Sequence, residues 1–174
     1  MLYRFDGKEP QVGQDSYISE TAILVGAVTI GDNCYIGHGT VLRGDYGSII
    51  IGNGTAVEEG VVIHAPPGET CTIGNRVTIG HGAIIHSKHI GDSAVIGMGA
   101  IISIRAEVGT DTIVAEGAVV KRNNTVEAGK VVAGNPARGV RDVSESDREY
   151  WNWAKEIYID LAKKYCRLGM ERVT

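Results

Sequence analysis

The sequence predicts an all-β solenoid, a parallel β-helix of hexapeptide repeats, followed by one C-terminal α-helix. The first observation is composition, because the 174 residues include 20 Ile and 19 Val against 5 Leu, with 24 Gly and one Phe. β-Branched side chains suit strands and are stiff in helices. The second observation is that no aromatic residue occurs between Tyr46 and Tyr150. The third is a repeat in the spacing of the aliphatic residues.

Aliphatic residues recur in steps of six through residues 18–42, 51–63, 73–85 and 90–132, which gives 19 registered positions. A period of six fits neither the 3.6-residue spacing of a helix nor a simple hairpin meander. Three hexapeptides make a triangular coil of about 18 residues, so roughly six coils should stack at about 4.8 Å. The registered side chains should fill a narrow interior without room for rings. Glycine follows eight of them, at corners that need a positive φ or a close backbone approach.

The character of the chain changes at Ser144. The segment Ser144–Asp147 is typical of a helix start with an acidic first turn, and Gly169 is a plausible end. Between them, apolar residues recur at helical spacing and predict the face that packs on the prism. We therefore expect a β-helix domain at 1–143 and a packed C-terminal helix at 144–174. The apolar positions are Tyr150, Ala154, Ile157, Tyr158, Leu161 and Tyr165.

Charge and cysteine content exclude several classes of function. The net charge of -4 and the pI near 5.7 provide no basic footprint, so neither nucleic acid nor an anionic membrane is an expected partner. No run of 18 apolar residues predicts a membrane span. Cys34, Cys71 and Cys166 are widely spaced, without a CxxC pair, and we expect them to be reduced. A cytoplasmic protein is the expectation.

Two columns of polar residues interrupt the repeat. Folding the registered positions three to a coil predicts that the residues following four of them stack on one side, in the order Arg43, His64, His86, Ser103. The pair His64 and His86 would then lie one coil apart, close enough to share a metal ion. A second column contains, in order, His38, Glu59, His81 and Met98.

His81 belongs to a different part of the coil from this pair. Five residues of extended chain separate His81 from His86, which is roughly 16 Å at ~3.3 Å per residue. That distance is too long for shared ligation within one chain. A neighbouring copy could bring its own His81 to the pair, and such a site would form three times in a cyclic homotrimer.

Short motifs along the repeat carry a resemblance to a known family. They are Val41–Asp45 (VLRGD), Ile49–Gly52 (IIIG), Val61–His64 (VVIH), Val77–His81 (VTIGH), Ile85–His86, Ile90–Asp92 (IGD), Ile96–Ala100 (IGMGA) and Gly134–Arg138 (GNPAR). With them, nearly the whole chain resembles the γ-class carbonic anhydrases and their relatives, which include ferripyochelin-binding proteins and accessory proteins of carnitine and phenylacetate operons. The resemblance implies that the β-helix is left-handed.

The resemblance also implies a site and a reaction. His64, His81 and His86 match the three zinc ligands of the family, with His81 supplied by the adjacent subunit. Arg43 and Asp45 match a pair that links subunits and orients the metal-bound water. Three neutral imidazoles leave an open position on the metal and lower the pKa of its water to near 7. The implied reaction is the reversible hydration of CO2 to bicarbonate by a metal-bound hydroxide at the subunit interface.

Two residues of this chain depart from the family pattern near the site. Where many relatives have Asn-Ile-Gln-Asp, residues 56–59 are Ala-Val-Glu-Glu, so Glu58 replaces an amide and Glu59 the following acid. Glu58 could act as a general base, or it could raise the pKa of the hydroxide by adding negative charge. Tyr158 falls where family members place a tyrosine that faces the site, and packing explains its helical spacing equally well.

Other metals and other functions fit the same residues. Zn2+ is the expected cofactor, and Fe2+ or Co2+ suit imidazole ligands as well. One alternative function is a hexapeptide acyltransferase or a hydrolase of CoA thioesters, which needs one histidine rather than three aligned ones. Another is a non-catalytic trimeric metal-binding protein. The fold alone does not decide among them.

Overall fold

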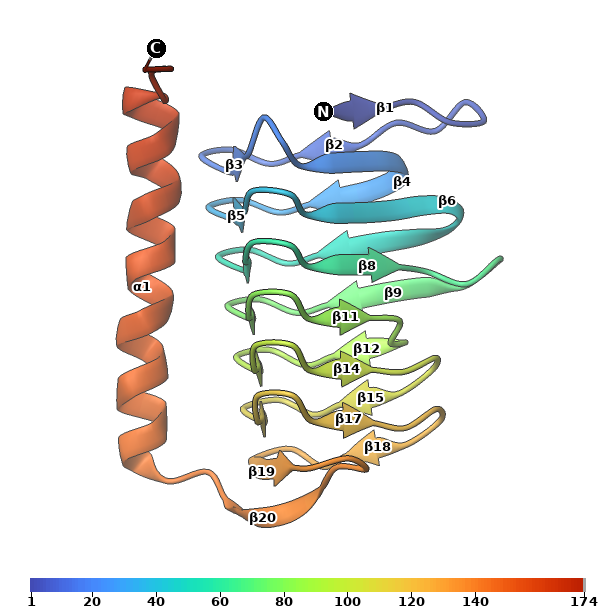
Figure 1. The fold of residues 1–174 in the computed structure, drawn as a ribbon, viewed down its shortest axis with the longest axis vertical. Coiled ribbons are helices and arrows are strands. Elements are labelled where there is room, and N and C mark those ends of the chain that lie inside the picture. The colour runs from blue at the N-terminus through green and yellow to red at the C-terminus, as the bar shows by residue number, and fades with distance from the viewer. Residues whose placement is uncertain (174) are drawn as a thin grey trace.

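The structure is a computed structural model that describes residues 1–173. The chain winds as a left-handed parallel β-helix, and one helix, α1 (Glu145–Leu168), runs back beside it toward the N-terminal coils (Figure 1). The predicted fold class is confirmed. Thr174, the last residue of the predicted C-terminal segment, lies outside the described residues. No helix among residues 1–173 is long and apolar enough to cross a membrane.

The coils have three sides, which we call the helix side, the second side and the third side. The helix side holds β3 (Tyr17–Ile18), β5 (Tyr35–Ile36), β7 (Ala56–Val57), β10 (Thr78–Ile79), β13 (Val95–Ile96), β16 (Ile113–Val114), β19 (Lys130–Ala133) and the antiparallel β20 (Arg138–Asp142). The second side holds β1 (Leu2–Tyr3), β8 (Val62–His64), β11 (Ile84–Ile85), β14 (Ile101–Ile102) and β17 (Val119–Val120). The third side holds β2 (Gln11–Val12), β9 (Thr70–Ile73), β12 (His89–Ile90), β15 (Glu107–Val108) and β18 (Thr125–Val126). The long strands β4 (Ile23–Ile30) and β6 (Val41–Ile51) pass from the second side onto the third.

Within residues 1–173, seven parallel strands stack along the helix side, one more than the roughly six coils that the repeat predicted. The 19 registered positions begin at Ile18 and end at Val132, both on the helix side, so this side holds seven of them and each other side six. Val12, six residues before Ile18, adds a third-side position that pairs with Ile30. Val12 is exposed, because its coil closes the end of the prism.

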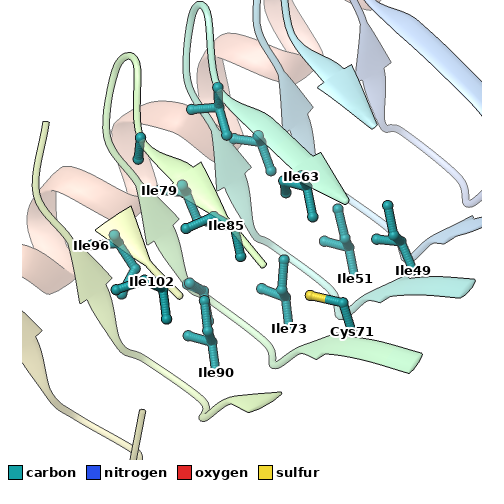
Figure 2. Packing of buried hydrophobic residues seen from close by; sticks show 14 of the residues in the cluster. Ile49, Ile51, Ile63, Cys71, Ile73, Ile79, Ile85, Ile90, Ile96 and Ile102 are labelled. Carbon is teal, nitrogen blue, oxygen red and sulfur yellow. The ribbon is translucent and has the colours of Figure 1, made fainter. Parts of the chain in front are cut away.

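The registered residues form the core. Ile63, Ile79 and Ile96 are fully buried, and Figure 2 shows such side chains stacked along the interior from coil to coil. Parallel pairing keeps this register, since Ile79 lies opposite Val57 on one neighbouring coil and Ile96 on the other. The six-residue period therefore specifies both the core and the stacking.

Replacing Ile79 with Ala should lower the free energy of unfolding by about 2–5 kcal/mol, because the stacked neighbours cannot collapse into the cavity. Urea unfolding followed by circular dichroism measures the loss. The matched control is Ile50→Ala on the third side, where the side chain is 43% exposed and the loss should be smaller. Equal losses in the two variants would contradict an interior position for Ile79.

One corner of the prism is fastened by an Asp/Asn ladder, the set Asp32, Asn53, Asn75 and Asp92. Each of these side chains accepts a backbone N–H from the preceding coil, at 2.7–2.9 Å. The glycine before each one lets the coils approach closely. At Gly91, an added Cβ would lie 2.5 Å from the Thr110 nitrogen. The recurring Ile-Gly-Asx pattern thus has a steric and a hydrogen-bonding cause.

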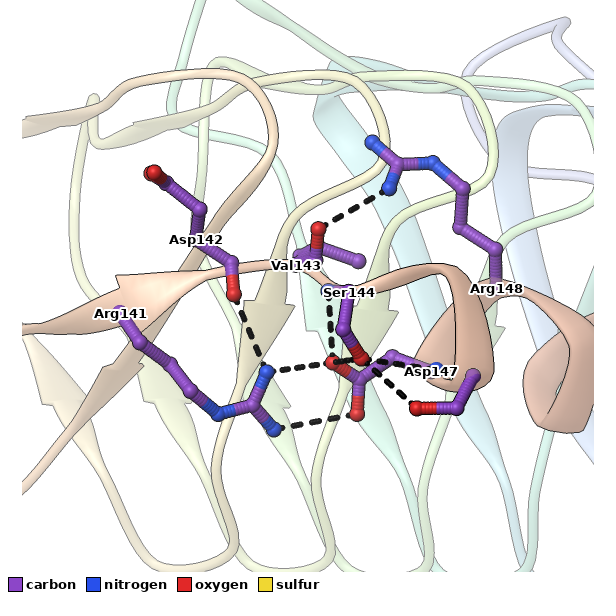
Figure 3. Close-up of polar contacts among 7 residues, drawn as sticks. Arg141, Asp142, Val143, Ser144, Asp147 and Arg148 are labelled. Atoms are coloured by element: carbon purple, nitrogen blue, oxygen red, sulfur yellow. Dashed lines mark hydrogen bonds and ion pairs between the residues drawn. The ribbon is translucent and has the colours of Figure 1, made fainter.

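Helix α1 begins where the sequence predicted. Ser144 is the N-cap: its hydroxyl accepts the Asp147 N–H at 3.2 Å, and its own N–H donates to the Asp147 carboxylate at 2.8 Å. Arg141 forms an ion pair with Asp147 and ties the helix start to β20 (Figure 3). Gly169 forms the C-cap.

The helix packs on the helix side against β3, β5 and β7. Tyr158, Leu161 and Tyr165 join the contact as predicted. Tyr150 and Ile157, predicted for the same face, are exposed, and the buried positions are Lys155 and Ala162. The packed face is rotated from the predicted one because the stem of a lysine can cover apolar surface as an aliphatic side chain does.

Candidate metal centre

His64 and His86 form a stacked pair between the second and third sides. His64 ends β8, and His86 follows β11 on the next coil. His64 Nδ1 lies 3.0 Å from His86 Nε2, and the ring centroids are 4.8 Å apart. The two residues therefore lie one above the other on successive coils, as the repeat predicted, with their rings tilted by 42°.

The surroundings of both rings favour the neutral form. Burial and the Arg43 cation lower the pKa of His64, although Asp45 opposes the shift, and burial, His64 and Arg43 lower the pKa of His86, although Glu69 opposes it. Neutral imidazoles keep a nitrogen lone pair for a metal ion. Two nitrogens that each lie ~2.05 Å from a tetrahedral Zn2+ are roughly 3.3 Å apart. The observed 3.0 Å is close to that spacing, so the pair fits two positions of such a site.

Arg43 and Asp45 extend the pair along β6. Arg43 lies opposite His64 in the sheet, and its guanidinium donates to Asp45 Oδ2 at 2.6 Å. The other oxygen of Asp45 lies 3.6 Å from His64 Nε2 and accepts the Tyr46 N–H at 2.9 Å. Burial opposes the shift, yet the bonds from Arg43 and Tyr46 lower the pKa of Asp45, which is therefore ionised near neutral pH. Arg43, Asp45, His64 and His86 make one cluster, which we call the pair cluster.

His81 stands at the other edge of the second side. It follows β10 and precedes β11, and its side chain is 48% exposed. Its Nε2 lies 3.0 Å from Glu58 Oε2, and its Nδ1 lies 2.8 Å from Glu59 Oε2. Two carboxylates thus fix the orientation of this ring.

Glu58 is the most buried acid in this group, at 6% exposure. Burial raises the pKa of Glu58, although Tyr158 and His81 oppose the shift. Its carboxylate also accepts the backbone N–H of His81 at 3.2 Å. Burial and the Glu58 charge raise the pKa of Tyr158, whose side chain reaches this carboxylate from α1. Glu58, Glu59, His81 and Tyr158 make a second cluster, which we call the His81 cluster.

Tyr35 lies against the His81 cluster and was missed by sequence reasoning. Its hydroxyl donates to Glu59 Oε1 at 2.6 Å, and its ring packs 5.3 Å from that of Tyr158. Burial opposes the shift, yet the Tyr35 bond and the His81 charge lower the pKa of Glu59. The sequence held one signal. Tyr35 directly precedes the registered Ile36, so its side chain points outward, on the side of the prism that α1 covers.

The two clusters are separate within one chain. Among residues 1–173, no three His, Cys, Asp or Glu side chains converge on a point where a single chain would hold a metal ion. The structure joins His64 with His86, Arg43 and Asp45, and joins His81 with Glu58, Glu59 and Tyr158. A site containing all three histidines requires a second copy of the chain.

Comparison with known proteins gives a consistent family. Residues 9–44 match the family described as bacterial transferase hexapeptide (six repeats), and residues 27–65 and 71–103 match the hexapeptide repeat of succinyl-transferase. The carnitine operon protein CaiE of Proteus sp. (strain LE138) is 36% identical over 173 residues, which cover 99% of this chain and 87% of that protein. The mitochondrial gamma carbonic anhydrase 2 of Arabidopsis thaliana is 34% identical over 162 residues, which cover 90% of this chain and 58% of that protein.

The solved structures agree with this result. The crystal structure of a hexapeptide transferase family protein from Anaplasma phagocytophilum superposes with a TM-score of 0.89 at 35% identity, covering 95% of this chain and 98% of that one. Relatives above 30% identity therefore span almost the entire β-helix and its helix. The chain belongs to the γ-carbonic-anhydrase-like family of hexapeptide-repeat proteins.

Proposed function

We propose that this protein is a γ-carbonic-anhydrase-like metalloenzyme that hydrates CO2 reversibly to bicarbonate at sites between the subunits of a homotrimer. The observation that carries the proposal is the facing pair of His64 and His86 nitrogens, 3.0 Å apart, on rings whose pKa values are lowered toward the neutral form. The kinship with gamma carbonic anhydrase 2 supports the same kind of function.

A row of outward-facing apolar residues, exposed at Val62 and Ile84 and half-buried elsewhere, supports the subunit interface. The residues Ile23, Val41, Val62, Ile84, Ile101 and Val119 lie opposite one another on successive strands of the second side. We call this row the apolar ladder. Val62 is 39% exposed and Ile84 is 46% exposed, whereas a solvated face of a sheet usually alternates to polar residues. Such a continuous row is typical of a surface that another protein covers.

The position of the two clusters favours a second copy of this chain as the occupant. The pair cluster lies at one edge of the apolar ladder and the His81 cluster at the other, on either side of β11. Packing the ladder of one copy against the next in a ring would bring the His81 edge of one chain to the His64–His86 edge of its neighbour. A cyclic trimer would repeat this contact three times.

A divalent cation bound by the three imidazoles would supply Lewis acidity and lower the pKa of a water molecule toward neutrality. Zn2+ is the proposed metal, and Fe2+ and Co2+ accept the same ligands. Arg43 would hold the bicarbonate anion with its cationic guanidinium. Asp45 is ionised and would accept a hydrogen bond that orients the reacting water. Glu58, next to His81 and largely out of solvent, would hold a proton, with Tyr158 positioning its carboxylate.

Metal analysis of the purified protein, paired with stopped-flow CO2 hydration, tests this function. We expect about one divalent metal ion per chain, because each interface of a closed ring holds one site. We also expect catalysed hydration that chelation abolishes and Zn2+ or Fe2+ restores. Protein that contains no stoichiometric metal and stays inactive with either ion would overturn the proposal. Stoichiometric metal without hydration would support a metal-binding role instead.

An acyl-CoA function is the second candidate, because the matching repeats are those of transferases and the Anaplasma protein is called a transferase. Calorimetric titration with coenzyme A distinguishes the two functions. Binding that persists after chelation would favour the transferase or thioesterase, since acyl transfer on this fold does not need three histidines. Absence of binding, together with metal-dependent hydration, favours the proposed enzyme.

A further inference from the structure

Lys155 is a buried lysine on the inner face of α1. Its side chain is 2% exposed, although lysines are rarely buried without a partner. Within residues 1–173, no side chain or backbone group forms a hydrogen bond or ion pair with its Nζ atom. Its Nζ lies over the Trp151 ring, 5.6 Å from the ring centroid, which is a cation–π distance. The amine is therefore held by packing and by this contact with the ring.

The surroundings favour the neutral amine. Burial lowers the pKa of Lys155 to about 8, nearby Arg76 adds to the shift, and Asp111 opposes it. The other charged groups around it are already engaged. Asp147 is paired with Arg141, and Arg148 donates to the Val143 carbonyl at 3.1 Å (Figure 3). Arg76 is paired with Glu156 from the helix at 2.7 Å.

A small cavity lies at this amine, between α1 and the turns of two coils. Its volume is about 50 Å³, and its polar lining comes from Ser93, Asp111, Asp147, Arg148 and Asn152. Sites for coenzymes and other large ligands occupy about 300–1,000 Å³. This space therefore admits a reagent of only a few heavy atoms, and it excludes an acyl-coenzyme.

We propose that Lys155 is a carbamylation site that takes up CO2. The lone pair of the neutral amine attacks the carbon of CO2, a C–N bond forms, and one C=O π pair moves onto oxygen. The nitrogen releases one proton to water or bicarbonate, which leaves R–NH–COO⁻ and no change in oxidation state. The product is an anion. At the cavity, Arg148 uses one of its N–H groups on Val143, and its remaining N–H groups and the Asn152 amide would stabilise the anion against the Asp111 and Asp147 carboxylates.

Carbamylation would make the helix a CO2-sensitive element. It replaces a neutral or cationic amine by an anion between α1 and the β-helix, and the carboxylates of Asp111 and Asp147 at the cavity oppose that anion. The modification lies on the helix side and uses none of the histidines. It therefore goes beyond CO2 hydration, and its test succeeds or fails independently of the metal.

Chemical trapping on the wild-type protein tests the proposal. The protein is equilibrated with 13C-bicarbonate, alkylated with triethyloxonium ion to fix carbamates as ethyl esters, digested and mapped by mass spectrometry. Exposed Lys164 on the same helix is the internal control. We expect at least about tenfold more trapped carbamate at Lys155 at pH 7.5, because an amine with a pKa of about 8 rather than 10.5 has roughly 200–300 times more neutral form at that pH. Equal labelling of both lysines, or none at Lys155, would overturn the proposal.

A pair of variants gives an independent readout by 13C NMR. The carbamate carbon signal of the wild type should disappear in Lys155→Met and persist in Lys164→Met. Methionine keeps the length of the buried stem, so α1 should stay docked. Persistence of the signal in Lys155→Met would contradict the assignment, and the peptide map does not depend on the folding of either variant.

Discussion

Replacing His86 with Ala should abolish metal binding and leave the β-helix folded. His86 lies outside the prism core, and its backbone N–H bonds to the Ile102 carbonyl at 2.8 Å whatever its side chain. Loss of a group that merely supports a metal ligand costs 10–100-fold in affinity, so loss of a ligand should cost at least about 100-fold. Competition titration with a zinc chelator and stopped-flow CO2 hydration measure the two effects.

The matched control for this variant is His89→Ala. His89 is exposed on β12 of the third side, and the variant should keep the metal content and the hydration rate of the wild type. Circular dichroism should be unchanged in both variants. Retention of one metal per chain by His86→Ala would contradict the proposed site. A trimer that dissociates on loss of the metal would indicate that the metal is structural.

Replacing Ile84 with Glu should prevent assembly of the trimer. The side chain stands in the middle of the apolar ladder, between Val62 and Ile101. Burying an unpaired carboxylate costs several kcal/mol even after partial compensation, and a cyclic trimer would pay that cost at three interfaces. Size-exclusion chromatography with light scattering should therefore show a monomer. Metal binding and CO2 hydration should be lost with it.

The control for the interface is Ile50→Glu. Ile50 is exposed to a similar degree, 43% against 46% for Ile84, but it faces the third side. This variant should remain trimeric and active. A trimeric, metal-loaded Ile84→Glu protein would show that the apolar ladder is not the subunit contact. A monomer that still binds metal tightly would place the site within one chain.

The sequence predicted the fold to the level of individual core residues. The six-residue period is local, so it places Ile63, Ile79 and Ile96 inside without knowledge of any distant contact. The helix start was equally readable, because the Ser144–Asp147 capping box is contained in four residues. The facing of His64 and His86 followed from the same period, since parallel in-register stacking repeats each position on the next coil.

Contacts made by the helix were less predictable. The link from Tyr35 through Glu59 to His81 depends on how α1 covers the helix side, and no spacing within the repeat specifies that. The burial of Lys155 had the same cause. Hydrophobic periodicity selects apolar residues, so it assigned Ile157 to the packed face. It left out Lys155, whose methylene stem packs on the β-helix instead.

The Asp/Asn ladder has a consequence for where this chain tolerates change. A ladder that joins successive coils from Gln14 to Asp92 at one corner demands constant length there, and residues 31–32, 52–53, 74–75 and 91–92 keep it. All the irregular steps of the repeat, after Leu42, Ile63 and Ile85, fall instead at the corner that holds the pair cluster. The number of residues is therefore constant at one corner of the prism and varies at another. Insertions at the second corner can add new functional side chains without disturbing the stacking of the coils.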